Sequence, residues 1–148
     1  MNNQFTDREQ VVETINKLFV YTDNQEWRKL QEEVFTEQVL LDMVSMGAPG
    51  VERVSAREIC YRWEAAFKEL DAVHHQAGNY IVQISDQQAN VTAYAIAIHY
   101  NESASSRKGK TREYVGSYDL HLEKGSNGWR IDQFKYHLKY SAGNMALV

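Results

Sequence analysis

The period of the hydrophobic pattern changes once along this chain, after Asp71. Before that residue, apolar side chains recur every three to four positions, which is typical of amphipathic helices. After it, apolar and polar side chains alternate over long stretches, which is typical of strands with one buried face. Helices first and strands last predict an α+β fold with a mostly antiparallel sheet, because a parallel sheet needs crossover helices between its strands.

Two capping-box patterns mark where helices are expected to begin. The first covers 6–9, and the second covers 55–58 and precedes an apolar stripe that includes Trp63 and Phe67. A shorter helix is expected over 27–34. The sequence therefore predicts three helices before the sheet, with Trp63 and Phe67 in the core.

Long strands dominate the second half. The predicted strands cover 73–85, 89–101, 111–124 and 129–140, and a short one covers 38–43. The four long strands are well above the usual length of about 5–6 residues. Long neighbouring strands twist and coil, so we expect a strongly curved sheet that leaves a cup between itself and the helices.

Composition narrows the class of protein. The chain has 148 residues, a net charge of −4 and one cysteine, Cys60. We expect one domain over 1–148, no nucleic-acid partner, no membrane span and, because no internal disulfide can form and the N-terminus is polar, a cytoplasmic location. The basic stretch 103–110, with Arg112 just after it, is interpreted as a solvated hairpin loop, with nucleic-acid binding as the alternative.

Two histidine positions are candidates for chemistry in the cup. His74 and His75 are adjacent in a strand, so only one of them can face the cup. His99 ends a strand whose same face carries only valine and alanine, and small side chains leave room for a helix or a ligand. A histidine there could be a general acid or base, or a hydrogen-bonded interior residue, and the sequence leaves both readings open.

Two aspartates complete the candidate set. Asp119 lies in the middle of a strand, where aspartate is depleted, so it either faces water or lines a polar pocket. Asp23 closes the first helix and is either a helix stop or a partner for another side chain. The chain carries no short metal-ligand motif and no glycine-rich phosphate loop, so we expect neither a metal nor a cofactor.

Several short segments, in this order and spacing, resemble a known family. They are Tyr21-Thr22-Asp23-Asn24-Gln25-Glu26-Trp27-Arg28-Lys29-Leu30, His74-His75-Gln76-Ala77-Gly78-Asn79, Gly116-Ser117-Tyr118, Gly128-Trp129-Arg130-Ile131 and Gly143-Asn144. The layout resembles the SnoaL-like domains of the nuclear transport factor 2-like superfamily, which includes scytalone dehydratase, ketosteroid isomerase and polyketide cyclases. This resemblance implies a cystatin-like α+β cone, usually cofactor-free and often dimeric.

The resemblance also implies roles for the candidate residues. Scytalone dehydratase has a catalytic histidine oriented by an aspartate of its first helix, and these resemble His75 and Asp23. Its second active-site histidine resembles His99, and an asparagine on a later strand falls near Asp119.

One departure from that enzyme limits the comparison. Its two tyrosines that bind the substrate carbonyl through water fall at Thr22 and Met43, which cannot do so in the same way. The resemblance therefore implies a pocket with a His–Asp pair, but not the same dehydration of the same substrate.

Two functions fit these expectations. The first is a cofactor-independent lyase or isomerase that moves a proton next to the carbonyl of a small apolar substrate, and the second is a noncatalytic ligand-binding or dimerisation module. We also expect a homodimer through the outer sheet face, which would hide apolar strand residues such as Tyr118, Leu120 and Leu122. The observation that discriminates the two functions is whether Asp23, His75, His99 and Asp119 share one cavity that solvent can reach.

Overall fold

The computed structural model describes residues 4–105 and 107–148. Its helices are α1 (Asp7–Asp23), the short α2 (Trp27–Lys29) with a π-helical turn η1 (Leu30–Val34), the 3₁₀ turn η2 (Val44–Met46) and α3 (Ala56–Phe67). Its strands are β1 (Phe35–Asp42), β2 (Glu52–Ser55), β3 (Ala72–Ser85), β4 (Gln88–Tyr100), β5 (Thr111–Gly125) and β6 (Gly128–Gly143). None of these helices is long and apolar enough to cross a membrane.

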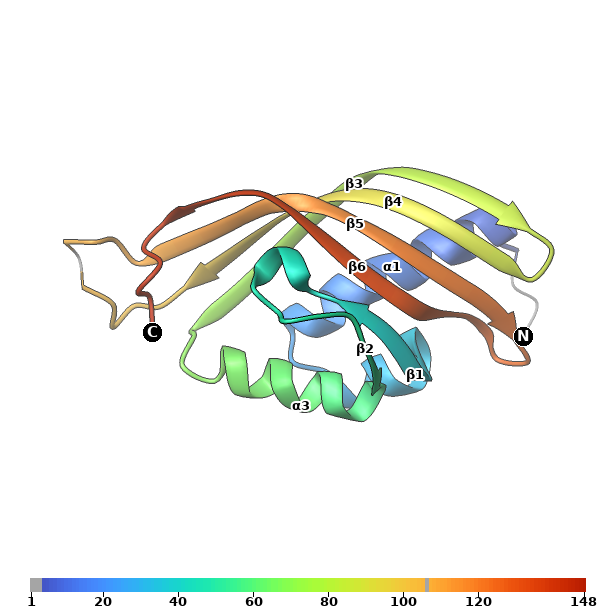
Figure 1. Ribbon diagram of the computed structural model, residues 1–148, viewed down its shortest axis with the longest axis horizontal. Coiled ribbons are helices and arrows are strands. Elements are labelled where there is room, and N and C mark those ends of the chain that lie inside the picture. Colours follow the sequence, from blue (N-terminus) through green and yellow to red (C-terminus); the bar gives the residue numbers. More distant parts are fainter. Residues whose placement is uncertain (1–3, 106) are drawn as a thin grey trace.

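The α+β fold class is confirmed: the three N-terminal helices lie on one sheet of six strands, ordered β2-β1-β6-β5-β4-β3. The pairing of β1 with β6 is parallel, and the other pairings within the described residues are antiparallel. Figure 1 shows β3 to β6 arching over α1 and α3, which lie on the same side of the sheet. This arrangement is the predicted curved sheet wrapped over helices.

Both predicted helix starts are observed, although only the first is a complete capping box. The Thr6 side chain accepts a hydrogen bond from the Glu9 backbone, and the Glu9 carboxylate accepts one from the Thr6 backbone. Ser55 caps α3 in the same way through the Glu58 backbone. The Glu58 carboxylate pairs instead with Arg62, one turn further along the helix.

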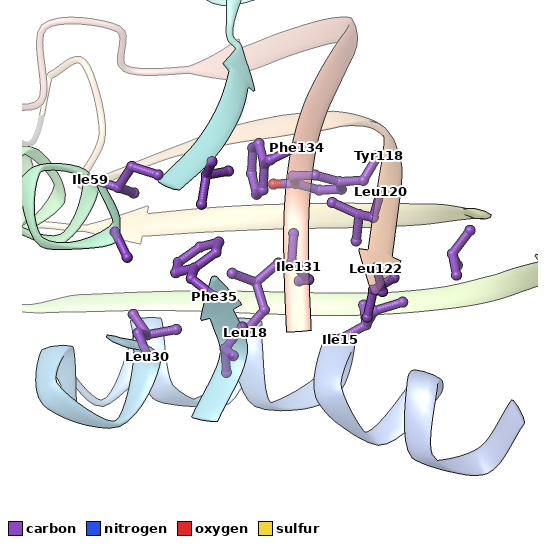
Figure 2. Packing of buried hydrophobic residues seen from close by; sticks show 14 of the residues in the cluster. Ile15, Leu18, Leu30, Phe35, Ile59, Tyr118, Leu120, Leu122, Ile131 and Phe134 are labelled. Carbon is purple, nitrogen blue, oxygen red and sulfur yellow. The ribbon is translucent and has the colours of Figure 1, made fainter. Parts of the chain in front are cut away.

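The core lies between α1 and the inner face of β5 and β6. Figure 2 shows Ile15 and Leu18 of α1 facing the sheet residues Leu122, Ile131 and Phe134. Each of these five side chains is buried. Burial of their apolar surface is the main term that holds the first helix on the sheet.

The placement of Trp63 and Phe67 in the core is confirmed in part, since Trp63 packs against the buried core. Both side chains are half-buried, and both line a cavity instead of packing fully inside. The ring of Trp63 contacts Phe35 and Phe134, while the ring of Phe67 meets His99. The helical stripe predicts which face of α3 turns inward, but not how deeply each of its side chains is buried.

One predicted strand differs from the observed structure, and one observed strand was missed. The short strand predicted over 38–43 begins earlier, at Phe35. The strand Glu52–Ser55 was not predicted, because a four-residue segment with only Val54 buried shows no alternation.

Small residues on β4 open the cup. The inward residues of β4 are buried and the outward ones are more exposed, as the alternation predicts. The inward set is Ala89, Val91, Ala93, Ala95, Ala97 and His99. Gly116 continues this small surface onto β5, where it pairs with Ala95. The sheet therefore offers a floor without large side chains beneath the end of α1.

Candidate active site

Within the described ranges 4–105 and 107–148, the carboxylate of Asp23 hydrogen-bonds to a single residue, His75. One carboxylate oxygen accepts the backbone N–H of His75 at 2.8 Å, and the other lies 2.6 Å from Nδ1 of its ring. Both side chains are largely buried, at 10% and 14% exposure for His75 and Asp23. Because a carboxylate accepts, the ring proton is assigned to Nδ1, and Nε2 is left as the nitrogen with a free lone pair.

His75, and not His74, faces the cavity. His75 lines it, whereas His74 is exposed on the other face of β3. The ring of His75 stacks on Phe19 of α1 with 5.2 Å between centroids. The helix that supplies the carboxylate therefore also supplies the aromatic surface that holds the imidazole in place.

His99 has the opposite kind of partner. The Arg112 Nε donates to His99 Nδ1 at 3.1 Å, so the ring proton is assigned to Nε2. Burial, followed by the nearby Arg112 charge, lowers the pKa of His99 to about 4. His99 is thus a neutral hydrogen-bond donor at neutral pH, whereas His75 offers an acceptor.

The cavity between these histidines has a volume of about 280 Å³. Its walls are mainly aromatic, and its lining comprises Leu18, Phe19, Thr22, Met43, Met46, Trp63, Ala66, Phe67, His75, Ala97, His99, Arg112, Tyr114, Tyr118, Phe134 and Tyr136. A pocket of this size and character suits a small ligand of one or two rings.

Two phenols are donors in the same cavity. The rings of Tyr118 and Tyr136 lie 4.8 Å apart on neighbouring strands. Burial raises the pKa of both phenols, that of Tyr136 to about 12. Both hydroxyls therefore keep their protons at neutral pH and can donate to an oxygen of a ligand.

A family model for the SnoaL-like domain matches residues 3–135. The chain belongs to the SnoaL-like family. Its fold is that of the nuclear transport factor 2-like superfamily, as the structural matches also show. No curated protein matches the sequence significantly.

Several solved structures have a fold similar to that of this SnoaL-like domain. The Kfla4162 protein of Kribbella flavida has a TM-score of 0.87 at 23% identity, with 92% of this chain and 93% of that chain covered. A candidate scytalone dehydratase of Novosphingobium aromaticivorans has a TM-score of 0.77 at 15% identity, covering 92% and 86%. The hexachlorocyclohexane dehydrochlorinase LinA-type3 of Novosphingobium barchaimii has 0.71 at 10%, covering 92% and 88%. At these identities the likeness concerns the fold alone.

Asp119 of this SnoaL-like domain does not share the cavity, which corrects the predicted placement. Its carboxylate lies on the outer sheet face, 51% exposed, 2.7 Å from Nε2 of His137 and 3.0 Å from the Thr92 hydroxyl. The neighbouring Tyr118 and Leu120 are buried inward, so strand alternation turns Asp119 outward. The structure brings Asp23, His75 and His99 together and leaves Asp119 outside.

Arg112 and the tyrosines were not among the predicted site residues. Arg112 falls in the predicted strand 111–124, next to the basic loop, and no role was predicted for it. It lies on the inner face of β5, where it pairs with His99 in the ladder. Tyr118 was assigned to the outer face. Tyr118, Gly116 and Tyr114 alternate along β5 and pair with the small inward residues of β4. This alternation is the signal that could have placed Tyr118 on the inner face.

Metal ligands are a separate question. Within 4–105 and 107–148, no three histidine, cysteine, aspartate or glutamate side chains are grouped closely enough to hold a metal ion.

Proposed function

We propose that this cavity catalyses proton transfer next to the carbonyl of a small apolar ligand, with side chains alone as catalysts. The observation that carries the proposal is the Asp23–His75 pair, with 2.6 Å between carboxylate oxygen and ring nitrogen, on the wall of an aromatic cavity. A general base needs a fixed orientation and a free lone pair directed at the substrate. The pair provides both.

The chemistry follows from the two histidines. His75 Nε2 removes a proton from the carbon next to the carbonyl, and the bonding electrons move onto the carbonyl oxygen. His99 Nε2–H and the phenols of Tyr118 and Tyr136 are the donors that would stabilise the resulting enolate. Return of the proton to another carbon gives an isomerisation, and loss of a leaving group from the neighbouring carbon gives an elimination.

Of the two reactions that this mechanism allows, the names of similar structures favour an elimination. Two of the similar structures carry the names dehydratase and dehydrochlorinase, which are both eliminations. Those names belong to proteins at most 15% identical to this chain. These names therefore support only the class of reaction, and the proposed mechanism rests on the residues of this chain.

Solvent deuterium exchange tests the proposal directly. In D₂O, the protein should accelerate exchange of the carbon-bound protons next to the carbonyl in apolar cyclic ketones such as 1-tetralone, followed by ¹H NMR. His75→Asn and Asp23→Asn should each lower the enzymatic rate by about 100-fold or more, which is the scale of general base catalysis.

The matched control is His121→Asn. His121 forms a His–Asp pair of the same 2.6 Å length with Asp132, outside the cavity. This variant should keep the full exchange rate. Exchange that survives His75→Asn contradicts the proposal, and saturable ketone binding without any exchange supports the alternative, a noncatalytic ligand-binding module.

We further propose that the chain forms a homodimer through the outer sheet face. The residues first expected to need a partner, Tyr118, Leu120 and Leu122, are buried in the core instead. Other apolar side chains take that place on β4 and β6: Tyr94, Ile96, Ile98 and Tyr140 are between 38% and 55% exposed. A second copy of the chain would cover this surface.

The cytoplasmic location expected from the sequence stays a prediction.

A further inference from the structure

Arg112 is a half-buried cation in an otherwise largely apolar cavity. It lies near the start of β5, opposite His99 in the β4–β5 ladder, and its side chain lines the cavity. Its Nε donates to His99, and the guanidinium carbon lies 5.9 Å from the centre of the Tyr114 ring. These contacts fix the position of the guanidinium without neutralising its charge.

The charge of Arg112 has no carboxylate partner among residues 4–105 and 107–148. The ion pairs of this part of the chain involve other basic residues. The terminal guanidinium nitrogens have no hydrogen-bond partner there either, since the contact with His99 uses Nε. The carboxylate of Asp23 directs both of its oxygens at His75.

A cation in this setting favours an anionic ligand. Removing a charge from water costs free energy unless the charge is paired. The planar guanidinium binds a carboxylate through two parallel hydrogen bonds, and such charge-assisted bonds are stronger than neutral ones. The aromatic side chains Phe19, Trp63, Phe67 and Phe134 line the rest of the cavity and suit a ring.

We propose that Arg112 binds a carboxylate of the ligand, so that the cavity takes an aromatic or similarly flat apolar acid. This inference rests on the proposed function for the location of the site and adds the class of substrate to it. The carboxylate lies at the Arg112 end of β5, and the ring extends over the small floor of β4 toward His75. Arg112 is then both a ligand-binding residue and the positioning residue that keeps the His99 proton on Nε2.

Binding of a matched pair of probes tests the inference without turnover. Isothermal titration at low ionic strength compares 2-naphthoate with 2-naphthamide, which has the same shape and no charge. We expect the wild-type protein to bind naphthoate at least about tenfold more tightly. Arg112→Gln should abolish this preference, and Arg112→Lys should keep part of it, because an ammonium retains the charge but not the planar fork.

Lys139→Gln is the matched control. It removes one positive charge from an exposed side chain that lies over Tyr94, outside the cavity. It should leave the preference unchanged. Equal affinity for both probes in the wild-type protein, a preference that survives Arg112→Gln, or no saturable binding of either probe would each overturn the inference.

A measurement on the wild-type protein covers the case in which Arg112→Gln does not fold. The Arg112 Nε–H signal in ¹H–¹⁵N NMR should shift on addition of naphthoate and stay in place on addition of naphthamide, and equal responses overturn the inference. The proposed function fails separately: ketone exchange depends on His75, whereas the naphthoate preference should persist in His75→Asn. Loss of one result without the other shows which proposal is wrong.

Discussion

Two histidines in one cavity have partners of opposite charge, and this difference separates their roles. His75 donates Nδ1–H to the carboxylate of Asp23, while His99 accepts at Nδ1 from the guanidinium of Arg112. The first arrangement exposes a lone pair to the cavity, and the second exposes an N–H. A base and a donor are therefore available together without any change in protonation of His99 at neutral pH.

The lowered pKa of His99 predicts a loss of stability in mild acid. Its folded pKa of about 4 lies below the ordinary value of 6.5. Between these values the unfolded chain binds a proton at His99 that the folded chain does not, so stability is complete above pH 6.5 and falls as the pH drops toward 4. Between about pH 7 and pH 5 the loss should be on the order of 1–2 kcal/mol, because solvent in the cavity screens part of the effect.

Urea unfolding at these two pH values measures the effect in the wild-type protein and in His99→Asn. The asparagine oxygen can still accept from Arg112 but does not titrate, so the variant should lose less stability on acidification. Groups elsewhere in the chain affect both proteins alike. An equal loss in the two proteins would show that His99 is not the titrating group.

Among the elements, β5 and β6 shape the deep part of the cavity by a close approach at Gly116. A Cβ atom there would lie 2.5 Å from the Tyr136 hydroxyl and would collide with the backbone oxygen of His137. The absence of a side chain at Gly116 on β5 therefore lets the ring of Tyr136 on β6 lie close to this position. This packing places the phenol beside Tyr118.

Gly116→Ala should destabilise the protein by about 2 kcal/mol or more and weaken ligand binding, because the backbone contact cannot relax as a flexible side chain would. Gly78→Ala on β3 is the control, since a Cβ there meets no atom within 4 Å. Chemical denaturation gives both values. A Gly116→Ala protein as stable as Gly78→Ala would show that the strands adjust without cost.

The positions of the helices and strands could be predicted from the sequence better than the direction in which individual strand side chains point. Alternation on β4 predicts the small inward face that ends at His99, and this is confirmed. The sequence left open whether Asp119 faces water or lines a pocket, because alternation along β5 does not show which of its two faces turns toward the helices. The parallel pairing of β1 with β6 depends on contacts between distant segments, and local periodicity carries no information about it. Arg112 was missed for a related reason, since a charge next to a polar loop looks solvated until the strand register is known.

On the scale of the whole molecule, the helices cover one face of the sheet and leave the other open. Apolar side chains lie on this outer face next to polar pairs such as Asp119–His137. Stable homodimers bury roughly 800 Å² or more on each partner. The width of a sheet with four long strands is sufficient for such an interface.

Ile96→Glu should therefore convert a dimer into a monomer, because it places a charge in the middle of the buried surface. Ile96 is 42% exposed on the outer face. Val20→Glu is the control, since Val20 is 52% exposed on α1. Sedimentation velocity at micromolar concentration should show a dimer for the wild-type protein and Val20→Glu. A monomeric wild-type protein would contradict the proposal.

The central claim is that one cavity holds two histidines whose ring protons are on opposite nitrogens, His75 as base and His99 as donor. Two-bond ¹H–¹⁵N NMR of ¹⁵N-histidine protein at about pH 9 reports the tautomer of each ring, with His75→Asn and His99→Asn giving the assignments. The account predicts the proton on Nδ1 for His75 and on Nε2 for His99, and a changed His75 signal in Asp23→Asn. A His75 ring protonated on Nε2, or two rings in the same tautomer, would contradict it.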